Sequence, residues 1–308
     1  MSPATEIFLT VRDYDLAATL NSGQVFRWQK IGDDWHGVLG KHFLRLTQTE
    51  NGIRAQAAAH VTDWDFLREF LQAEIDLAAV LKTFPDDAPM NQAVAHCPGL
   101  RLLRQDAWEC LASFILSSTK QIVQIRQIVA LLCEHFGEPV QVERLTPCTP
   151  PPTNENILVH HDGAPGVTHP TMAFSFPTPQ RIAAASEAQL RTCKMGFRAP
   201  SLHAAARAIA DGKIGLEKIR TLDYPAARNE LMTLRGVGGK IADCVLLFAY
   251  GFDTAFPVDV WIERALQQLY FPRRRASEKR LQKFAATHFG PHAGYAQQYL
   301  FHYMRTKA

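Results

Sequence analysis

The stretch LRGVGGKIADCVLLF, residues 234–248, decides how the C-terminal part of this chain folds. Its centre contains three glycines, Gly236, Gly238 and Gly239. Lys240 follows them directly, and an apolar run begins at once. Because glycine adopts positive φ readily, the stretch and the preceding NELMTL predict two helices joined by a tight turn.

The backbone of this turn is suited to an anion. The first N–H groups of a helix have no partner inside it, and glycines leave their N–H groups uncovered, so a phosphate is a natural ligand. On the glycines alone, a plain helical hairpin that binds nothing is the simpler interpretation. A P-loop is excluded, because the glycine spacing differs and Ile241, not Ser or Thr, follows the lysine.

Lys240 and Asp259 suggest that this hairpin carries a catalytic nucleophile and a supporting carboxylate. A lysine at the positive end of a helix dipole, partly buried, is favoured as the neutral amine, a nucleophile that can form a Schiff base. A solvated lysine contacting phosphate is the other interpretation. Asp259, in AFPVDVWIERAL, precedes an apolar-periodic helix and is predicted as its N-cap. Placed near Lys240, its carboxylate would stabilise positive charge developing on a sugar.

Composition sets broad limits. The 308 residues are 47% hydrophobic and 20% charged, with a net charge of +3 that is compatible with a polyanionic partner. MSPATEIFLT has no signal pattern and no apolar run is long enough to cross a membrane, so we expect a cytoplasmic protein. The six cysteines form no CxxC pair and are interpreted as reduced core residues: Cys97, Cys110, Cys133, Cys148, Cys193 and Cys244.

The first hundred residues predict an antiparallel sheet with flanking helices. Short runs rich in aromatic and branched residues alternate with turn signals, which favours a meander of strands at 24–30, 34–39, 42–48 and 52–57. DWDFLREFLQ and IDLAAVLKTF are predicted helices, the first capped by Asp63 or Asp65. We place an N-terminal sheet domain at 1–100.

The remaining residues, 101–308, predict a helical domain. Apolar residues recur at three and four positions in segments 106–118, 120–137, 179–194, 199–212, 227–234, 259–270, 277–290 and 292–305. Gly137 is a natural helix stop. The Pro/His-rich segment at about 147–172 is predicted to be an irregular insertion. Its histidines, His160, His161 and His169, lack a ligand pattern, so no metal is expected there.

Six motifs in order give the chain a family resemblance. The stretch LRGVGGKIADCVLLFAYGFDTAFPVDVW resembles the helix-hairpin-helix and aspartate motif of base-excision DNA glycosylases. SGQVFRW, GVL…LTQTE, LLRQDAWECLASFILSS, MGFRA and GYAQQYLF narrow the resemblance to eukaryotic-type 8-oxoguanine DNA glycosylases. The resemblance covers nearly the whole chain apart from the insertion. It implies an α+β fold, an antiparallel sheet domain followed by a helical helix-hairpin-helix domain.

The resemblance also implies an activity and a partner. Lys240 would attack C1′ of a damaged nucleotide and hold it as an imine, and Asp259 would support the charge. The enzyme would remove 8-oxoguanine from double-stranded DNA and nick the abasic strand by β-elimination. It would act as a monomer and would have no membrane partner. A monovalent cation at the hairpin carbonyls is compatible with the motif, although no residue demands it.

Other site residues carried over from the resemblance fall into three groups. Base recognition is implied for Gly23, whose carbonyl would accept N7–H, and for Cys244, Phe248, Gln297 and Phe301. The opposite base and the wedge are implied for Phe197, Arg198, Thr119 and Gln124. DNA phosphate contacts are implied for Gly236, Gly238, Lys240 and Trp261. Taken singly, most of these residues are equally at home in a core, a turn or a solvated surface.

This chain departs from the family pattern at three places. Thr119 replaces an asparagine that fills the gap left by the flipped base, and Gln124 replaces an arginine that reads the opposite cytosine. Strict cytosine preference is therefore in doubt. Trp261 stands where the eukaryotic proteins have a phosphate-contacting histidine. No cysteine follows Cys244, which excludes the four-cysteine iron–sulfur cluster of endonuclease III relatives.

Two alternatives remain open. One is a glycosylase for another damaged purine, such as an alkylated base. Helix-hairpin-helix relatives of that kind keep the aspartate and lack the lysine. The other is a non-catalytic DNA-binding module, which would need neither Lys240 nor Asp259.

Overall fold

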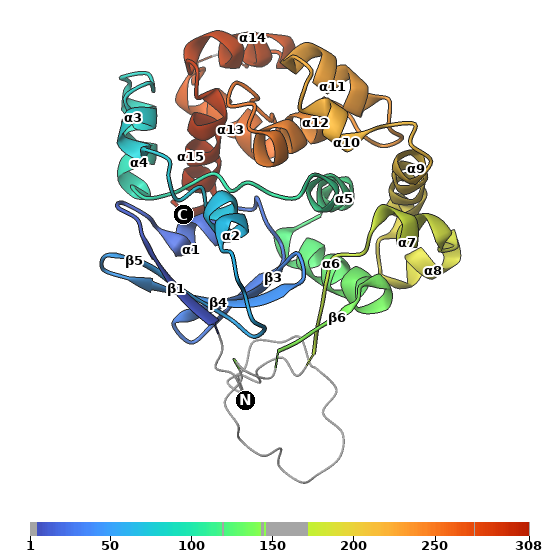
Figure 1. Ribbon diagram of the computed structural model, residues 1–308. Coiled ribbons are helices and arrows are strands. Elements are labelled where there is room, and N and C mark those ends of the chain that lie inside the picture. Colours follow the sequence, from blue (N-terminus) through green and yellow to red (C-terminus); the bar gives the residue numbers. More distant parts are fainter. Residues whose placement is uncertain (1–4, 119, 143–144, 146–171, 274, 308) are drawn as a thin grey trace.

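A computed structural model describes residues 5–118, 120–142, 145, 172–273 and 275–307 (Figure 1). Thr119 and nearly all of the predicted insertion at 147–172, including its three histidines and Cys148, lie outside the described residues. The described cysteines are buried and free. In the described part of the chain, no helix combines the length and apolar character needed to cross a membrane.

The N-terminal part is a five-stranded antiparallel sheet. Its strands are β1 (Thr5–Thr10), β2 (Trp28–Ile31), β3 (Asp34–Leu39), β4 (His42–Thr49) and β5 (Gly52–Ala57), in the order β1-β5-β4-β3-β2. The meander from β2 to β5 is confirmed. Strand β1 was not predicted, because it pairs with β5 far along the chain rather than through a local hairpin. Strand β2 begins at Trp28 instead of Gln24, because the Gln24 side chain is hydrogen-bonded to the backbone of Arg101 and Leu103.

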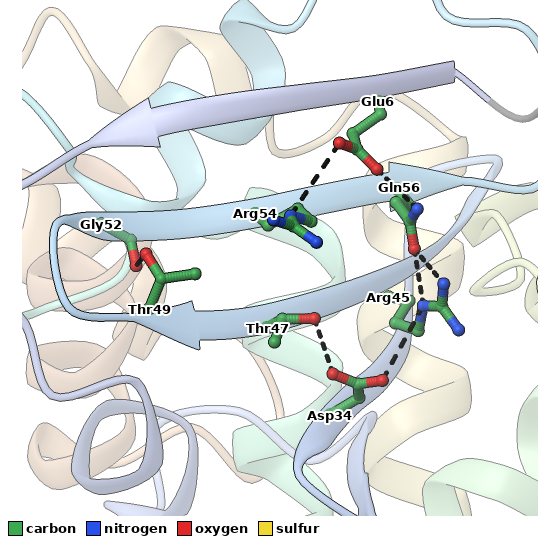
Figure 2. A network of polar contacts seen from close by, with 8 residues as sticks. All are labelled: Glu6, Asp34, Arg45, Thr47, Thr49, Gly52, Arg54 and Gln56. Atoms are coloured by element: carbon green, nitrogen blue, oxygen red, sulfur yellow. Dashed lines mark hydrogen bonds and ion pairs between the residues drawn. The ribbon is translucent and has the colours of Figure 1, made fainter.

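Side chains alternate across the sheet, as strand geometry requires. One face is apolar and includes Leu44, Leu46, Ile53 and Ala55. The other carries a polar ladder, seen close up in Figure 2, in which Gln56 Nε2 donates to Glu6 (2.6 Å) and Arg45 Nε donates to Gln56 (2.7 Å). Thr47 completes it by donating to Asp34 at 2.6 Å.

Four helices accompany the sheet: α1 (Leu16–Asn21), α2 (Asp65–Leu71), α3 (Leu77–Leu81) and α4 (Ala88–His96). Helix α2 packs on the sheet, whereas buried residues of α3 and α4 belong to the core of the helical part. Neither Asp63 nor Asp65 is the N-cap of α2. That position is Trp64, and Asp63 instead accepts the backbone N–H of Asp65 at 2.8 Å, because its side chain points forward along the chain.

The helical part surrounds α5 (Ala107–Ser117), which is apolar and buried along most of its length (Figure 1). The predicted helix at 179–194 is two helices, because Ser186 and Gln189 form a capping box that starts the second. The other elements, in chain order, are α6 (Ile122–Phe136), β6 (Pro139–Val140), β7 (Ala173–Phe174), α7 (Pro179–Ala184), α8 (Glu187–Thr192), η1 (Gly196–Arg198), α9 (Ala199–Ala210), α10 (Leu216–Ile219), α11 (Tyr224–Met232), α12 (Gly239–Val245), η2 (Leu246–Tyr250), α13 (Val260–Leu269), α14 (Glu278–His288) and α15 (Ala293–Thr306).

Candidate active site

The predicted hairpin is present between α11 and α12. Gly236 has φ +82°, and a Cβ there would lie 2.5 Å from Ser201 Oγ, so both the backbone conformation and the space require glycine. Gly238 is the N-cap of α12 and has no side chain to cap the helix. Open space faces it. The first N–H groups of α12 are therefore presented at the protein surface.

Lys240 occupies the first turn of α12, partly buried against an aromatic side chain. Its Nζ lies 5.1 Å from the ring centroid of Phe114. Phe248 is buried and stacks on Phe114 at 5.6 Å between centroids. Phe248 is therefore the second ring of an aromatic pair, and Phe114 is the ring that the amine contacts.

Cys244 lies one turn beyond the lysine and interacts with it. Burial raises the pKa of the Cys244 thiol to about 12, while a hydrogen bond and charge from Lys240 act in the opposite direction. The negative charge of Asp259 also raises this pKa. Lys240 and Asp259 thus both act on Cys244, which brings groups of α12 and the start of α13 together at one place.

Asp259 is the N-cap of α13, as predicted. Its Oδ1 accepts backbone N–H groups of Trp261 at 3.0 Å and Ile262 at 2.9 Å. These bonds fix the carboxylate at the start of α13. Trp261, in the same turn, is 36% exposed, and the guanidinium of Arg264 lies 5.5 Å from its ring.

Gly23 meets the C-terminal helix at a second wall of the site. It has φ +81°, and a Cβ on it would lie 3.2 Å from Phe301 and 3.0 Å from Ile122. Its loop is held by Gln24, whose amide donates to the Arg101 carbonyl and accepts from the Leu103 N–H, both at 2.8 Å. The loop between α1 and β2, helix α6 and helix α15 therefore converge at Gly23.

Gln297 and Phe301 lie one turn apart on α15. Gln297 is 4% exposed, and its Oε1 is buried with no hydrogen-bond partner among the described residues. The neighbouring Gln298 instead donates to the Ser22 carbonyl at 2.8 Å, which ties α15 to the Gly23 loop. A buried amide oxygen without a donor is suited to a ligand that brings N–H groups.

The predicted wedge lies at η1. Phe197 is 67% exposed, and the guanidinium of Arg198 lies 4.2 Å from its ring. Arg198 itself is only 3% exposed and donates to the Ser118 carbonyl, so it is not the solvated charge that its sequence context alone suggests. Gln124 is exposed and caps α6, its side chain accepting the Gln121 N–H at 3.3 Å.

Comparison with known families decides the relationship. Residues 6–111 match the 8-oxoguanine DNA glycosylase N-terminal domain, and residues 112–290 match the HhH-GPD superfamily of base excision DNA repair proteins. This chain belongs to the 8-oxoguanine DNA glycosylase family.

Relatives of this glycosylase span its whole length. A probable N-glycosylase/DNA lyase of Methanothermobacter thermautotrophicus is 29% identical, over 96% of this chain and 95% of the relative. The structure of MBOgg1 with a low-affinity DNA ligand matches with TM-score 0.86 and 29% identity, covering 100% of this chain and 98% of that one. The Clostridium acetobutylicum 8-oxoguanine glycosylase/lyase, bound to DNA with cytosine opposite the lesion, matches with TM-score 0.84 and 25% identity, covering 99% and 98%.

Sequence reasoning missed three side chains that lie at the candidate site: Phe114, Arg126 and Arg305. Phe114 lies in an apolar helix and was indistinguishable from core. Arg126 and Arg305 lie near each other, because the charge of Arg126 acts to lower the pKa of Arg305. Their helical spacing from Ile122 and Phe301, four residues in each case, was the available signal.

Proposed function

We propose that this chain excises 8-oxoguanine from duplex DNA and then cleaves the abasic strand. The observation that carries the proposal is the Lys240 amine, which lies 5.1 Å from the Phe114 ring and beside the buried thiol of Cys244, on which the charge of Asp259 also acts. An amine in such a place is positioned as a nucleophile. A non-catalytic DNA-binding hairpin would have no use for this arrangement.

In the proposed mechanism the lesion nucleotide leaves the helix and enters the site. A base inside a duplex is out of reach, so it must be extruded. Lys240 Nζ attacks C1′, and the C1′–N9 bond breaks with its electron pair going to the base, which takes up a proton. Asp259 stabilises the positive charge that develops on the sugar. Opening of the sugar ring gives an imine, and loss of a C2′ proton expels the 3′ phosphate.

The proposed base pocket combines stacking with edge recognition. Phe301 and Cys244 would lie on either face of the base, and the unpartnered Gln297 Oε1 would accept from its Watson–Crick edge. The Gly23 carbonyl would accept the N7–H that 8-oxoguanine has and guanine lacks. Phe248 would support this wall through Phe114. Gly236, Gly238 and Trp261 would contact DNA phosphates.

Three residues bear on recognition of the base opposite the lesion: Phe197, Arg198 and Gln124. Phe197 is exposed enough to wedge into the base stack, whereas Arg198 would have to leave the Ser118 carbonyl to reach a cytosine. Gln124 is committed to a helix cap. We therefore propose that the preference for cytosine opposite the lesion is weaker than the family pattern implies.

The remaining proposals concern organisation. We keep a sheet domain at 1–100 and a helical domain at 101–308, although α3 and α4 pack into the helical core. We also propose that the chain acts on DNA as a monomer in the cytoplasm. Among the described residues, no group of three or more His, Cys, Asp and Glu side chains is placed to hold a metal ion.

Measuring release of the damaged base from duplex DNA tests the proposed function. Duplexes with 8-oxoguanine opposite each of the four bases are incubated with the protein beside matched duplexes containing guanine or 3-methyladenine. We expect release of 8-oxoguanine with strand cleavage, and a modest preference for cytosine. Release of 3-methyladenine with no action on 8-oxoguanine would make the alkylated-purine alternative correct.

A further inference from the structure

Helix α15 carries three side chains in one stripe. Gln297, Phe301 and Arg305 are four residues apart, so they lie on the same face, and helix geometry puts about 12 Å between the two ends. The stripe contains an amide, an aromatic ring and a guanidinium. Gln297 and Phe301 are already part of the proposed pocket, and Arg305 has not yet been given a role.

Arg305 lies against Phe301 and Gly23, two residues of the proposed base pocket. Its guanidinium carbon lies 5.2 Å from the Phe301 ring centroid, and its Nη1 is 3.4 Å from the position of a Cβ on Gly23. Gly23 belongs to the loop between α1 and β2, so Arg305 connects that loop with α15. Asp259 is the carboxylate whose charge acts on Arg305, which places the guanidinium on the side of the catalytic groups.

The Arg305 guanidinium is incompletely satisfied. Its Nη1 is buried and has no hydrogen-bond partner among the described residues. Burial lowers the pKa of Arg305, and the charge of Arg126 lowers it further. Arg126 cannot satisfy Arg305 Nη1, because a guanidinium has no acceptor atom, and its own Nη2 donates to Asn21 Oδ1 at 3.1 Å. A buried cation with a free N–H is stabilised by a ligand that brings an acceptor atom.

We propose that Arg305 donates a hydrogen bond to the C8 oxygen of the extruded 8-oxoguanine, an inference that rests on the proposed function. A purine stacked on Phe301 with its Watson–Crick edge at Gln297 directs its five-membered ring toward the other end of the stripe. There the Gly23 carbonyl would face N7–H and Arg305 would face the adjacent oxygen. Guanine has neither the N7 proton nor the C8 oxygen.

A backbone phosphate is the other acceptor that DNA offers. It fits less well, because Arg305 Nη1 is buried between Gly23 and Phe301 rather than at the outer surface. Phosphate contacts contribute affinity independently of the base, whereas a base contact contributes only when the base is present. This difference separates the two by experiment.

The test measures dissociation constants in a Lys240→Gln background, which prevents turnover. Three duplexes are compared, with 8-oxoguanine, guanine or a tetrahydrofuran abasic analogue opposite cytosine. Lys307→Leu is the matched control, because Lys307 Nζ lies 4.8 Å from the Tyr303 ring on the same helix, also four residues away. It removes an equivalent cation without approaching Gly23.

We expect Arg305→Leu to weaken binding of the 8-oxoguanine duplex about tenfold, about 1.4 kcal/mol, and to leave the other two duplexes nearly unchanged. Arg305→Lys, which keeps the charge without the planar fork, should lose part of the same preference. It serves as the second variant if Arg305→Leu does not fold. Lys307→Leu should change the dissociation constants of all three duplexes equally and only slightly.

Equal weakening of all three duplexes by Arg305→Leu would overturn the inference in favour of a phosphate contact. No weakening, or tighter binding of the 8-oxoguanine duplex, would overturn it in favour of a packing role. If the Lys240→Gln parent itself does not distinguish 8-oxoguanine from guanine, the proposed function fails along with the inference. That outcome is recognised in the parent, before any Arg305 variant is compared.

Discussion

Asp243 and Arg228 form the most consequential ion pair of the hairpin at the scale of single residues. Arg228 Nε donates to Asp243 Oδ1 at 2.7 Å, and Tyr224 donates to the same oxygen at 2.8 Å. Arg228 also lies so close to Gly239 that a Cβ there would be 2.1 Å from Nη2. The pair therefore joins α11 to α12 across the glycine turn, one turn from Lys240.

Replacing Arg228 by leucine should destabilise the protein in a pH-dependent way. Burial raises the pKa of Asp243, and Arg228 acts to lower it, so removal of the arginine raises it further. Breaking a buried pair costs 3–5 kcal/mol, and we expect about 2 because Arg228 is partly exposed. A carboxylate with a raised folded-state pKa is penalised above that pKa and relieved below it. The loss should be full at neutral pH and shrink as pH falls.

Denaturant unfolding across pH measures this effect. Asp243→Asn in the Arg228→Leu background should restore part of the stability at neutral pH, because the unpaired charge is gone. A destabilisation by Arg228→Leu that is the same at acidic and neutral pH would contradict the assigned ion pair.

At the scale of elements, local signals predicted well and non-local ones did not. The meander from β2 to β5 and the hairpin at Gly236 follow from turn residues and periodicity, and both are confirmed. Strand β1 depends on pairing with β5, far along the chain, so no local pattern marked it. Helices α1 and α4 were also not predicted, although each begins at an aspartate N-cap, Asp15 and Asp87, that the sequence offered as a local signal. The split between α7 and α8 was available in the Ser186 capping box, which the apolar periodicity concealed.

Substitutions of Asp259, the N-cap of helix α13, distinguish its structural role from its proposed chemical role. Asparagine caps helices about as well as aspartate but carries no charge, whereas alanine loses the cap at a cost of about 1 kcal/mol. We expect Asp259→Asn to keep near-normal stability and to slow base excision roughly 100-fold. Asp259→Ala should lose both stability and activity.

Thermal unfolding and single-turnover excision distinguish the two roles, with duplex binding as the control. If Asp259→Asn excises at the wild-type rate, the carboxylate acts only as a cap.

At the scale of the whole molecule, the site exists because the sheet and helical parts meet at Gln24. This side chain is fully buried, and it was not recognised in the sequence because its partners, near 101–103, are distant along the chain. Phe114 and Arg305 were missed for the same reason, because the residues they contact, Lys240 and Gly23, are distant along the chain. The positions of Lys240 and Asp259 at helix starts, by contrast, were predictable from the glycine turn and the N-cap signal.

Gln24→Ala should therefore affect both stability and activity. It leaves the Arg101 carbonyl and Leu103 N–H buried and unpaired, at about 1–3 kcal/mol each, so we expect a loss of about 3 kcal/mol. Excision should also slow, because the adjacent Gly23 carbonyl loses its support. Gln29→Ala, at an exposed position of β2, is the matched control and should change neither. A Gln24→Ala protein as stable as the control would show that the loop is held by other contacts.

The central claim is that the Lys240 amine is the nucleophile. The most direct measurement is borohydride trapping with an 8-oxoguanine duplex, followed by peptide mass spectrometry of the covalent adduct. The account predicts one adduct, carried by Lys240, and none from Lys240→Gln. An adduct on another residue, or equal trapping by Lys240→Gln, would contradict it.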